Sequence, residues 1–255
     1  MATTVRRRGL TRQVTAPKEP APVQERRGHR FIAAYLALVA VATLGFGALV
    51  LFVRDQDVLT VFDGPVARAI QGVHTPVLSW VLTHTSDLGW FPYNVLCFAL
   101  VVVPLVALRL RLEAVVIVAS TLIAGGLGTL VKDLVQRARP TAGFVHVAAY
   151  LRDYSFPSGH VIFATVLFGV TFWVVWIAWK NSLLRNVTLV GLAAVITLMG
   201  FSRVYLGEHW PSDVLGAYCL ASLWVAGTIE VLLALKGRLG TWWAGRPHRR
   251  QWTAL

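Results

Sequence analysis

Residues 154–179 read YSFPSGHVIFATVLFGVTFWVVWIAW, a run of 26 residues without Lys, Arg, Asp or Glu. A helix of about 20 apolar residues crosses the ~30 Å hydrocarbon layer of a membrane, so this stretch predicts a transmembrane helix. Ser158 is a favourable residue to cap the start of that helix. The stretch therefore predicts a membrane helix that begins at a polar motif, and that motif contains a histidine.

Five more uncharged or nearly uncharged runs lie on either side of this one. They cover residues 31–53, 88–108, 114–131, 186–202 and 214–235, the last broken only by Glu230. The whole chain is 56% hydrophobic and 14% charged, whereas soluble domains carry about 25% charged residues. The fold class expected is all-α, a polytopic bundle of six transmembrane helices.

The runs divide the chain into four expected parts. Residues 1–30 form a basic tail expected to be disordered, and residues 236–255 form a second basic tail. Residues 31–87 hold the first transmembrane helix and a segment whose apolar residues recur at helical spacing, expected to lie as an amphipathic segment on the outer membrane face. Residues 88–235 form the membrane core. Both cysteines fall inside apolar runs, so no disulfide framework is expected.

The distribution of basic residues predicts the orientation. With six spans both termini share one side, and 17 of the 24 Lys and Arg lie on that side. The positive-inside rule then places both termini in the cytoplasm and segments 54–87, 132–153 and 203–213 outside the cell membrane. Membrane topology accounts for the net charge of +12 better than nucleic-acid binding does, so no nucleic-acid partner is expected.

Three polar clusters fall on the predicted outer side. They are KDLVQRARP at residues 132–140, PSGH at 157–160 and SRVYLGEHWPSD at 202–213. Lys132 and Arg139 are about two helical turns apart, with Pro140 expected to end their helix, and Arg203 arrives at the end of another run. Each cation alone could simply meet lipid headgroups. Three of them beside two histidines suit a phosphate group better, because Arg offers a planar fork of donors and Lys a point charge.

The two histidines occupy different settings. The PSGH motif places His160 at a helix start, where free backbone N–H groups favour an anion and the ring can donate a proton to a leaving oxygen. A capped transmembrane helix alone would not explain that histidine. His209 precedes Asp213 by four residues, so the carboxylate can hold one imidazole nitrogen and leave the other as a nucleophile or base. The alternative for this pair alone is a structural helix cap.

Together the clusters resemble the signature motifs of the type 2 phosphatidic acid phosphatase superfamily, K-x6-RP, PSGH and SR-x5-H-x3-D. The same motifs occur in soluble vanadium haloperoxidases, but six apolar runs argue against that branch. The matching residues are Lys132, Arg139 and Pro140; Pro157, Ser158, Gly159 and His160; and Ser202, Arg203, His209 and Asp213.

The resemblance implies a role for each of these positions. It implies a six-helix core over roughly residues 90–235, with the site at one membrane face and no metal or cofactor. His209 would be the nucleophile that forms a phosphohistidine, Asp213 its orienting partner, and His160 the proton donor to the leaving group. The phosphate oxygens would be held by Lys132, Arg139, Ser158, Gly159 and Arg203.

Several functions fit these implications. The first is a phosphatase acting on a lipid phosphate or diphosphate, with a polyprenyl diphosphate such as undecaprenyl diphosphate as the leading substrate; phosphatidic acid and phosphatidylglycerol phosphate stay open. The second is a lipid phosphotransferase that passes the phosphate to an alcohol, and the third a non-catalytic lipid transporter. The expected partners are the lipid phosphate and membrane lipids, and the sequence does not determine the oligomeric state. Arg137 is left undecided between the phosphate site and the headgroups.

Overall fold

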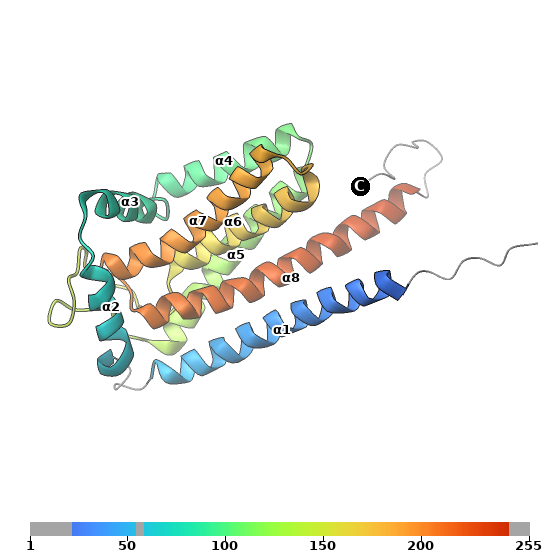
Figure 1. The fold of residues 1–255 in the computed structure, drawn as a ribbon. Coiled ribbons are helices and arrows are strands. Elements are labelled where there is room, and N and C mark those ends of the chain that lie inside the picture. Colours follow the sequence, from blue (N-terminus) through green and yellow to red (C-terminus); the bar gives the residue numbers. More distant parts are fainter. Residues whose placement is uncertain (1–21, 55–58, 245–255) are drawn as a thin grey trace, which may run out of the picture. The chain divides into compact units, whose positions relative to one another are not determined.

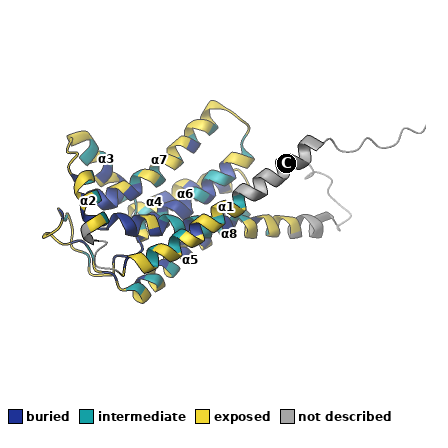
Figure 2. Ribbon diagram, turned by 60° about the horizontal axis from the view of Figure 1, so that its bottom comes forward, coloured by how far each residue is buried: buried dark blue, intermediate teal, exposed yellow. Residues whose placement is uncertain are grey.

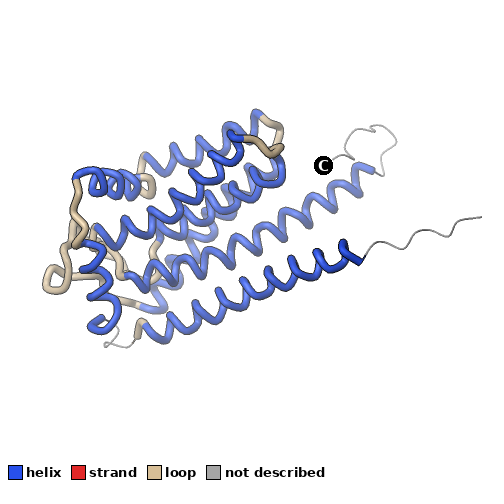
Figure 3. The backbone as a smooth tube through the Cα atoms, in the orientation of Figure 1, coloured by secondary structure: helices blue, strands red, loops and turns tan. Residues whose placement is uncertain are grey.

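A computed structural model describes residues 22–54 and 59–244. Within these ranges the regular elements are all helices, joined by loops, and there is no β-strand, which confirms the all-α fold class (Figure 3). The elements are α1 Pro22–Phe52, the π-helical turn η1 Leu59–Asp63, α2 Gly64–Gln71, α3 Pro76–Asp87, α4 Tyr93–Ala107, α5 Arg111–Val135, α6 Gly159–Ala178, α7 Leu183–Tyr205 and α8 Pro211–Ala244 (Figure 1).

Five of the described helices are long and apolar enough to cross a membrane: α1, α5, α6, α7 and α8. The sixth expected span, residues 88–108, contains the shorter α4. Its 15 residues rise about 22 Å, less than the ~30 Å hydrocarbon layer. The helix is short because Pro92 directly precedes its first residue and Arg109 turns the chain after it with a φ of 64°. The expectation of six full-length spans is therefore not reproduced.

Helix α6 lies at the centre of the bundle and packs against α5, α7 and α8. It is apolar on all sides, as expected for a helix surrounded by other helices, and most of its residues are buried (Figure 2). By contrast, α7 is mostly exposed along the half that begins at Leu183. Gly128 of α5 allows close packing, since a methyl group there would lie 2.8 Å from Ile162 Cδ1.

The ends of four helices meet at one end of the bundle, beside α2 and α3 (Figure 1). They are the last turns of α5 and α7 and the first turns of α6 and α8. Gln71 of α2 connects the loops there: its amide nitrogen donates to the carbonyls of His146 (2.8 Å) and Tyr205 (3.1 Å), and its amide oxygen accepts from the His146 N–H at 3.0 Å. Because the three polar clusters lie at these helix ends and in the loops that join them, they occupy the same end of the molecule.

The segment between α1 and α4, expected to be amphipathic, is divided into separate helices. It forms α2 and α3, because Thr75 caps a new helix by accepting from the Leu78 N–H at 3.2 Å, and Pro76 begins it. The buried residues of η1 and α2 include the polar Asp63 and Gln71, whereas Val61 is 78% exposed. The apolar residues of this segment are therefore divided: Ala67 and Ile70 pack on the core, whereas Val61 faces away from it.

The tails differ in part from the sequence expectation. Helix α1 begins at Pro22, so residues 22–30 are helical rather than disordered, and α8 continues to Ala244, past the expected end of the core at residue 235. The remaining tail residues, 1–21 and 245–255, lie outside the described ranges.

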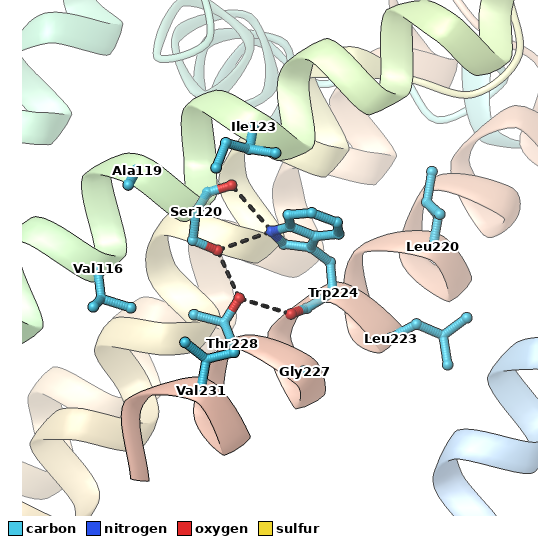
Figure 4. Close-up of a pocket in the computed structure, with 10 residues that line it drawn as sticks. All are labelled: Val116, Ala119, Ser120, Ile123, Leu220, Leu223, Trp224, Gly227, Thr228 and Val231. Carbon is cyan, nitrogen blue, oxygen red and sulfur yellow. Dashed lines mark hydrogen bonds between the residues drawn. The ribbon is translucent and has the colours of Figure 1, made fainter. Parts of the chain in front are cut away.

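The structure also contains a cavity of about 510 Å³ between α5 and α8 (Figure 4). Its polar lining groups bond to one another: Ser120 Oγ lies 2.6 Å from Thr228 Oγ1, and Trp224 Nε1 donates to the Ser120 carbonyl at 3.0 Å. No residue of the three polar clusters lines this cavity, so it is separate from the candidate site.

Candidate active site

His209 and Asp213 form the buried centre of the site. His209 lies in the turn between α7 and α8, and Pro211 starts α8, so that Asp213 in the first helical turn reaches back to the ring. His209 Nδ1 lies 3.5 Å from Asp213 Oδ2, and the two residues are 2% and 0% exposed. This spacing is longer than a normal hydrogen bond, as is common before a substrate binds. The expected pairing is present.

The contacts of His209 define its tautomer. Arg139 Nη1 lies 3.2 Å from His209 Nε2, and a guanidinium can only donate, so Nε2 must accept and Nδ1 carries the proton toward Asp213. Burial lowers the pKa of His209 to about 3; the charges of Arg139 and Arg203 also lower it, while Asp213 acts in the opposite direction. At neutral pH the ring is therefore uncharged, and Nε2 carries an electron pair that accepts from Arg139.

Lys132 and Arg139 are brought together through a carboxylate. Arg139 Nη2 donates to Asp153 Oδ1 at 2.7 Å, and Lys132 Nζ bonds the other oxygen of the same group. Burial alone would raise the pKa of Asp153, but the hydrogen bonds and charges of Lys132 and Arg139 lower it to about 2. The two cations thus hold one oxyanion, the Asp153 carboxylate, between them.

The route of the chain between these two cations differs from the expected continuous helix. Helix α5 ends at Val135, and Gln136 follows with a left-handed φ of 55°, so Arg139 lies in a loop. The turn at Gln136, and not Pro140, ends the helix.

Three buried groups at the site lack a hydrogen-bond partner among the described residues. They are the Ser158 hydroxyl, His160 Nε2 and Arg203 Nε. The other Arg203 nitrogens donate to Ser86 Oγ at 2.5 Å and to the Glu208 carboxylate. Buried polar groups are normally satisfied, so three such groups at one site fit a polar ligand. The space beside Gly159 is open, because a methyl group there would meet no atom within 4 Å.

His160 is held by the turn between α3 and α4. The Trp90 ring packs edge-on against the imidazole with centroids 4.6 Å apart, and Arg203 Cζ lies 5.8 Å from the same indole. A methyl group on Gly89 would lie only 2.0 Å from His160 Cδ2. Gly89 and Trp90 lie in the apolar run at residues 88–108, which predicted only a membrane span. The one feature of the sequence that distinguishes them is a Gly-Trp pair at the start of that run.

Arg137 belongs to neither of the two environments considered for it. It is 7% exposed, and Nη1 donates to Asp213 Oδ1 at 2.5 Å. Ser155 donates to the other oxygen of that carboxylate at 2.5 Å. Neither contact follows from a spacing pattern, because Arg137 and Ser155 lie 76 and 58 residues from Asp213.

All eight residues predicted for the site lie at this one end of the bundle. Direct contacts join His209 to Asp213 and Arg139. Glu208 connects this group to Arg203, because its carbonyl accepts from Arg139 Nη1 at 2.5 Å and its carboxylate accepts from Arg203. The full set is Lys132, Arg139, Ser158, Gly159, His160, Arg203, His209 and Asp213.

Comparison with known proteins gives matches to the same region. Residues 113–235 match the family described as the PAP2 superfamily. The chain is 31% identical over 146 residues to an undecaprenyl-diphosphatase of Sulfolobus acidocaldarius, covering 54% of this chain and 60% of that protein. It is 34% identical over 100 residues to phosphatidylglycerophosphatase B of Bacillus subtilis, covering 38% of this chain and 47% of that one. The matches thus span less than two thirds of either relative.

The fold also matches a solved structure. A crystal structure of a transmembrane PAP2-type phosphatidylglycerolphosphate phosphatase from Bacillus subtilis superposes with a TM-score of 0.66 and 21% identity, covering 83% of this chain and 98% of that chain. The likeness shows a shared fold, and it agrees with the apolar helices in showing a multi-pass membrane protein.

Proposed function

Because this chain carries a PAP2 superfamily domain at residues 113–235, we propose that it is a metal-independent phosphatase that hydrolyses lipid-linked phosphate or diphosphate monoesters through a phosphohistidine. The family resemblance of the motifs is confirmed. The observation that carries the proposed chemistry is the 3.2 Å contact of His209 Nε2 with Arg139, beside the Lys132–Arg139 cation pair. Because Arg139 can only donate, this contact requires an unprotonated Nε2.

The proposed reaction has two steps. Arg139 turns from His209 Nε2 to the phosphate oxygens, Nε2 attacks phosphorus, and the bond from phosphorus to the leaving lipid oxygen breaks. His160, which takes up a proton when the negatively charged phosphate binds beside it, gives that proton to the leaving oxygen. Water then attacks the phosphohistidine and gives a proton to His160, so inorganic phosphate leaves and the enzyme is restored. Asp213 stabilises the positive charge that the ring of His209 gains on attack.

The phosphate oxygens are assigned to the remaining motif residues. Donors placed where negative charge develops are usually the largest contribution to such catalysis. The carboxylate of Asp153 moves off its two cations when a phosphate oxygen takes its place. The donors are the side chains of Lys132, Arg139, Ser158 and Arg203 and the N–H of Gly159.

The leading substrate is a polyprenyl diphosphate such as undecaprenyl diphosphate. A relative named for that activity shares 31% identity with this chain, and the phosphatidylglycerophosphatase relative keeps phosphatidylglycerol phosphate as the second candidate. A phosphotransferase would use the same first step and differ in the acceptor, so the product distinguishes the two.

Phosphate release from a panel of lipid phosphates by the purified protein in detergent tests this function. We expect inorganic phosphate as the product, with undecaprenyl diphosphate the fastest substrate and full activity in excess EDTA. Vanadate, which mimics the transition state of phosphoryl transfer, should inhibit. Activity lost in EDTA and restored by a divalent ion would contradict the metal-independent chemistry, and a phosphorylated alcohol without free phosphate would indicate a transferase.

We further propose that α4 crosses as a sixth span, that both termini are cytoplasmic and that the site faces outward. The division into tails at residues 1–30 and 236–255, an entry segment at 31–87 and a phosphatase core at 88–235 belongs to the same proposal. An ion pair at the opposite end of the bundle agrees with it: Lys236 Nζ of α8, on an exposed side chain, lies 2.6 Å from the buried Glu113 Oε1 of α5, and both residues are predicted to lie on the cytoplasmic side.

Cysteine labelling in intact cells tests this orientation. Thr141, near the site, and Asn181, between α6 and α7, are both exposed. In a protein lacking Cys97 and Cys219, a membrane-impermeant maleimide should label Thr141→Cys and leave Asn181→Cys unlabelled until the membrane is broken. The reverse pattern would place the site in the cytoplasm.

A methyl group at Gly89 tests the role of His160. Gly89→Ala should lower kcat about 10²-fold or more, because the methyl group displaces the His160 ring and proton transfer contributes roughly 10²–10⁴ in rate. Gly191→Ala on α7 is the matched control, since no atom lies within 4 Å of a methyl group there. Wild-type turnover by folded Gly89→Ala protein would remove His160 from the mechanism.

A further inference from the structure

The carboxylate of Asp213 is held from behind by a buried chain of charges. Arg137 Nη1 donates to Asp213 Oδ1 at 2.5 Å, and Arg137 Nη2 donates to Asp63 Oδ2 at 2.5 Å. Asp63 and Asp213 are 0% exposed and Arg137 is 7% exposed. We infer that Asp63 and Arg137 are positioning residues that orient Asp213, and through it His209; the inference rests on the proposed function of that pair.

Arg137 is not placed to bind phosphate. Both of its terminal nitrogens already bond carboxylates, whereas Arg139, two residues later, contacts His209 Nε2 and the exposed carboxylate of Asp153. The left-handed residue Gln136 redirects the chain directly before this pair. Two nearby arginines of the same motif therefore serve different groups: one the reacting nitrogen, the other the carboxylate behind the ring.

Asp63 binds the start of α8 as well as Arg137. Its Oδ1 accepts from the Ser212 N–H at 2.9 Å, and its Oδ2 accepts from the Ser212 hydroxyl at 2.7 Å. A carboxylate at the first turn of a helix is stabilised by the unbonded N–H groups and the helix dipole. Asp63 thus fixes the backbone next to Asp213 and the guanidinium that bonds Asp213.

The geometry assigns a separate task to each oxygen of Asp213. Oδ1 is occupied by Arg137, and Oδ2 is left to face His209 Nδ1 together with the Ser155 hydroxyl and the Trp210 N–H. A carboxylate held at both oxygens cannot rotate, so the proton of His209 stays on Nδ1 and Nε2 stays unprotonated.

The charges of the chain explain why two residues are needed. A lone Arg137 beside Asp213 would neutralise the carboxylate that must stabilise the charged ring, and an unpaired buried charge is costly. Asp63 balances Arg137, so the pair holds Asp213 without adding net positive charge near His209. Asp63 belongs to η1, upstream of the matched family region at residues 113–235, so a segment outside that region completes the site.

The variants Arg137→Gln and Asp63→Asn test this in the full-length protein. Interaction networks of this kind couple residues by amounts equivalent to about 10- to 100-fold in rate, so we expect kcat to fall by that factor. The vanadate concentration for half inhibition should change less than about 3-fold, because Arg137 does not touch the phosphate site. Arg139→Gln should strongly raise the vanadate concentration for half inhibition. Arg152→Gln, an exposed arginine of the same loop, is the matched control.

The tautomer of His209 distinguishes a positioning role from a purely structural role, because a residue that only stabilises the fold would not change it. In protein labelled with ¹⁵N-histidine, the signals absent from His209→Ala identify this ring. We expect a single Nδ1–H tautomer in the wild type, a mixture in Arg137→Gln, and partial return in Arg137→Lys, which keeps the charge. If Arg137→Gln does not fold, Asp63→Asn is used in its place. Its side-chain amide oxygen can still accept from the Ser212 N–H, so the start of α8 keeps this bond.

Coupling to Asp213 completes the test. In an Asp213→Asn background, Arg137→Gln should lower kcat by less than about 3-fold further, because Arg137 acts through the Asp213 carboxylate, which this background already lacks. An unchanged His209 tautomer in Arg137→Gln and Asp63→Asn would overturn the inference, as would weakened vanadate binding equal to that of Arg139→Gln. The tautomer result holds whether or not the protein hydrolyses a lipid phosphate, so failure of the proposed function would be recognised separately.

Discussion

The His209→Ala protein should release no measurable phosphate, with a rate about 10⁴–10⁶-fold below that of the wild type, the loss typical for removal of a catalytic nucleophile. The reason is that Nε2 of this ring is the atom that attacks phosphorus. Nε2 is kept unprotonated by the proton on Nδ1 and by a pKa that burial lowers to about 3. Phosphate release from undecaprenyl diphosphate measures the effect.

His146→Ala is the matched control for this variant. His146 lies in the loop at the same end of the bundle, is exposed, and contacts Gln71 through its backbone only. Its removal should leave the rate within about 2-fold, as for surface substitutions generally. Normal activity in folded His209→Ala protein would contradict the mechanism.

The Asp213→Asn protein should lose about 10²–10⁴-fold in kcat, the range seen when a catalytic histidine loses the carboxylate that sets its tautomer. Asp213 also accepts from three other groups: Ser155, the Trp210 N–H and Arg137. The asparagine side chain has an NH₂ group in place of one carboxylate oxygen. This group would face one or more of the three donors without accepting from them, so the melting temperature should fall as well. Measurements of kcat, thermal unfolding and the His209 tautomer together check the effect.

The exposed pair His84–Asp87 provides a matched control for Asp213→Asn. Its Nδ1–Oδ2 distance is 3.1 Å, and its side chains are 54% and 39% exposed. Asp87→Asn should leave both kcat and stability close to wild type, because exposed ion pairs contribute little. An Asp213→Asn protein that hydrolyses as fast as Asp87→Asn would show that His209 needs no carboxylate.

The features that follow from local patterns could be read from the sequence. Apolar runs of sufficient length gave five of the expected helices, and the four-residue spacing of His209 and Asp213, with Pro211 at the helix start, predicted a contact that the structure contains. Periodicity and capping are local properties, so a single sequence carries them.

The features that the sequence did not predict depend on distant residues or on backbone conformation. Asp63 bonds Arg137 and Ser212 across 74 and 149 residues, and no spacing rule connects such positions. The end of α5 depends on Gln136 taking a left-handed conformation, which few non-glycine residues adopt. Likewise, nothing in the apolar run at residues 88–108 showed that Gly89 packs against His160.

The most direct test of the account is the chemical identity of the phosphoenzyme. Wild-type protein is mixed with ³²P-labelled lipid phosphate, quenched in alkali, in which phosphohistidine survives, and digested for mass spectrometry. The account predicts a single labelled residue, His209, phosphorylated on Nε2, because Nδ1 is directed toward Asp213. Label on His160, on Nδ1, or on no histidine during active turnover would contradict it.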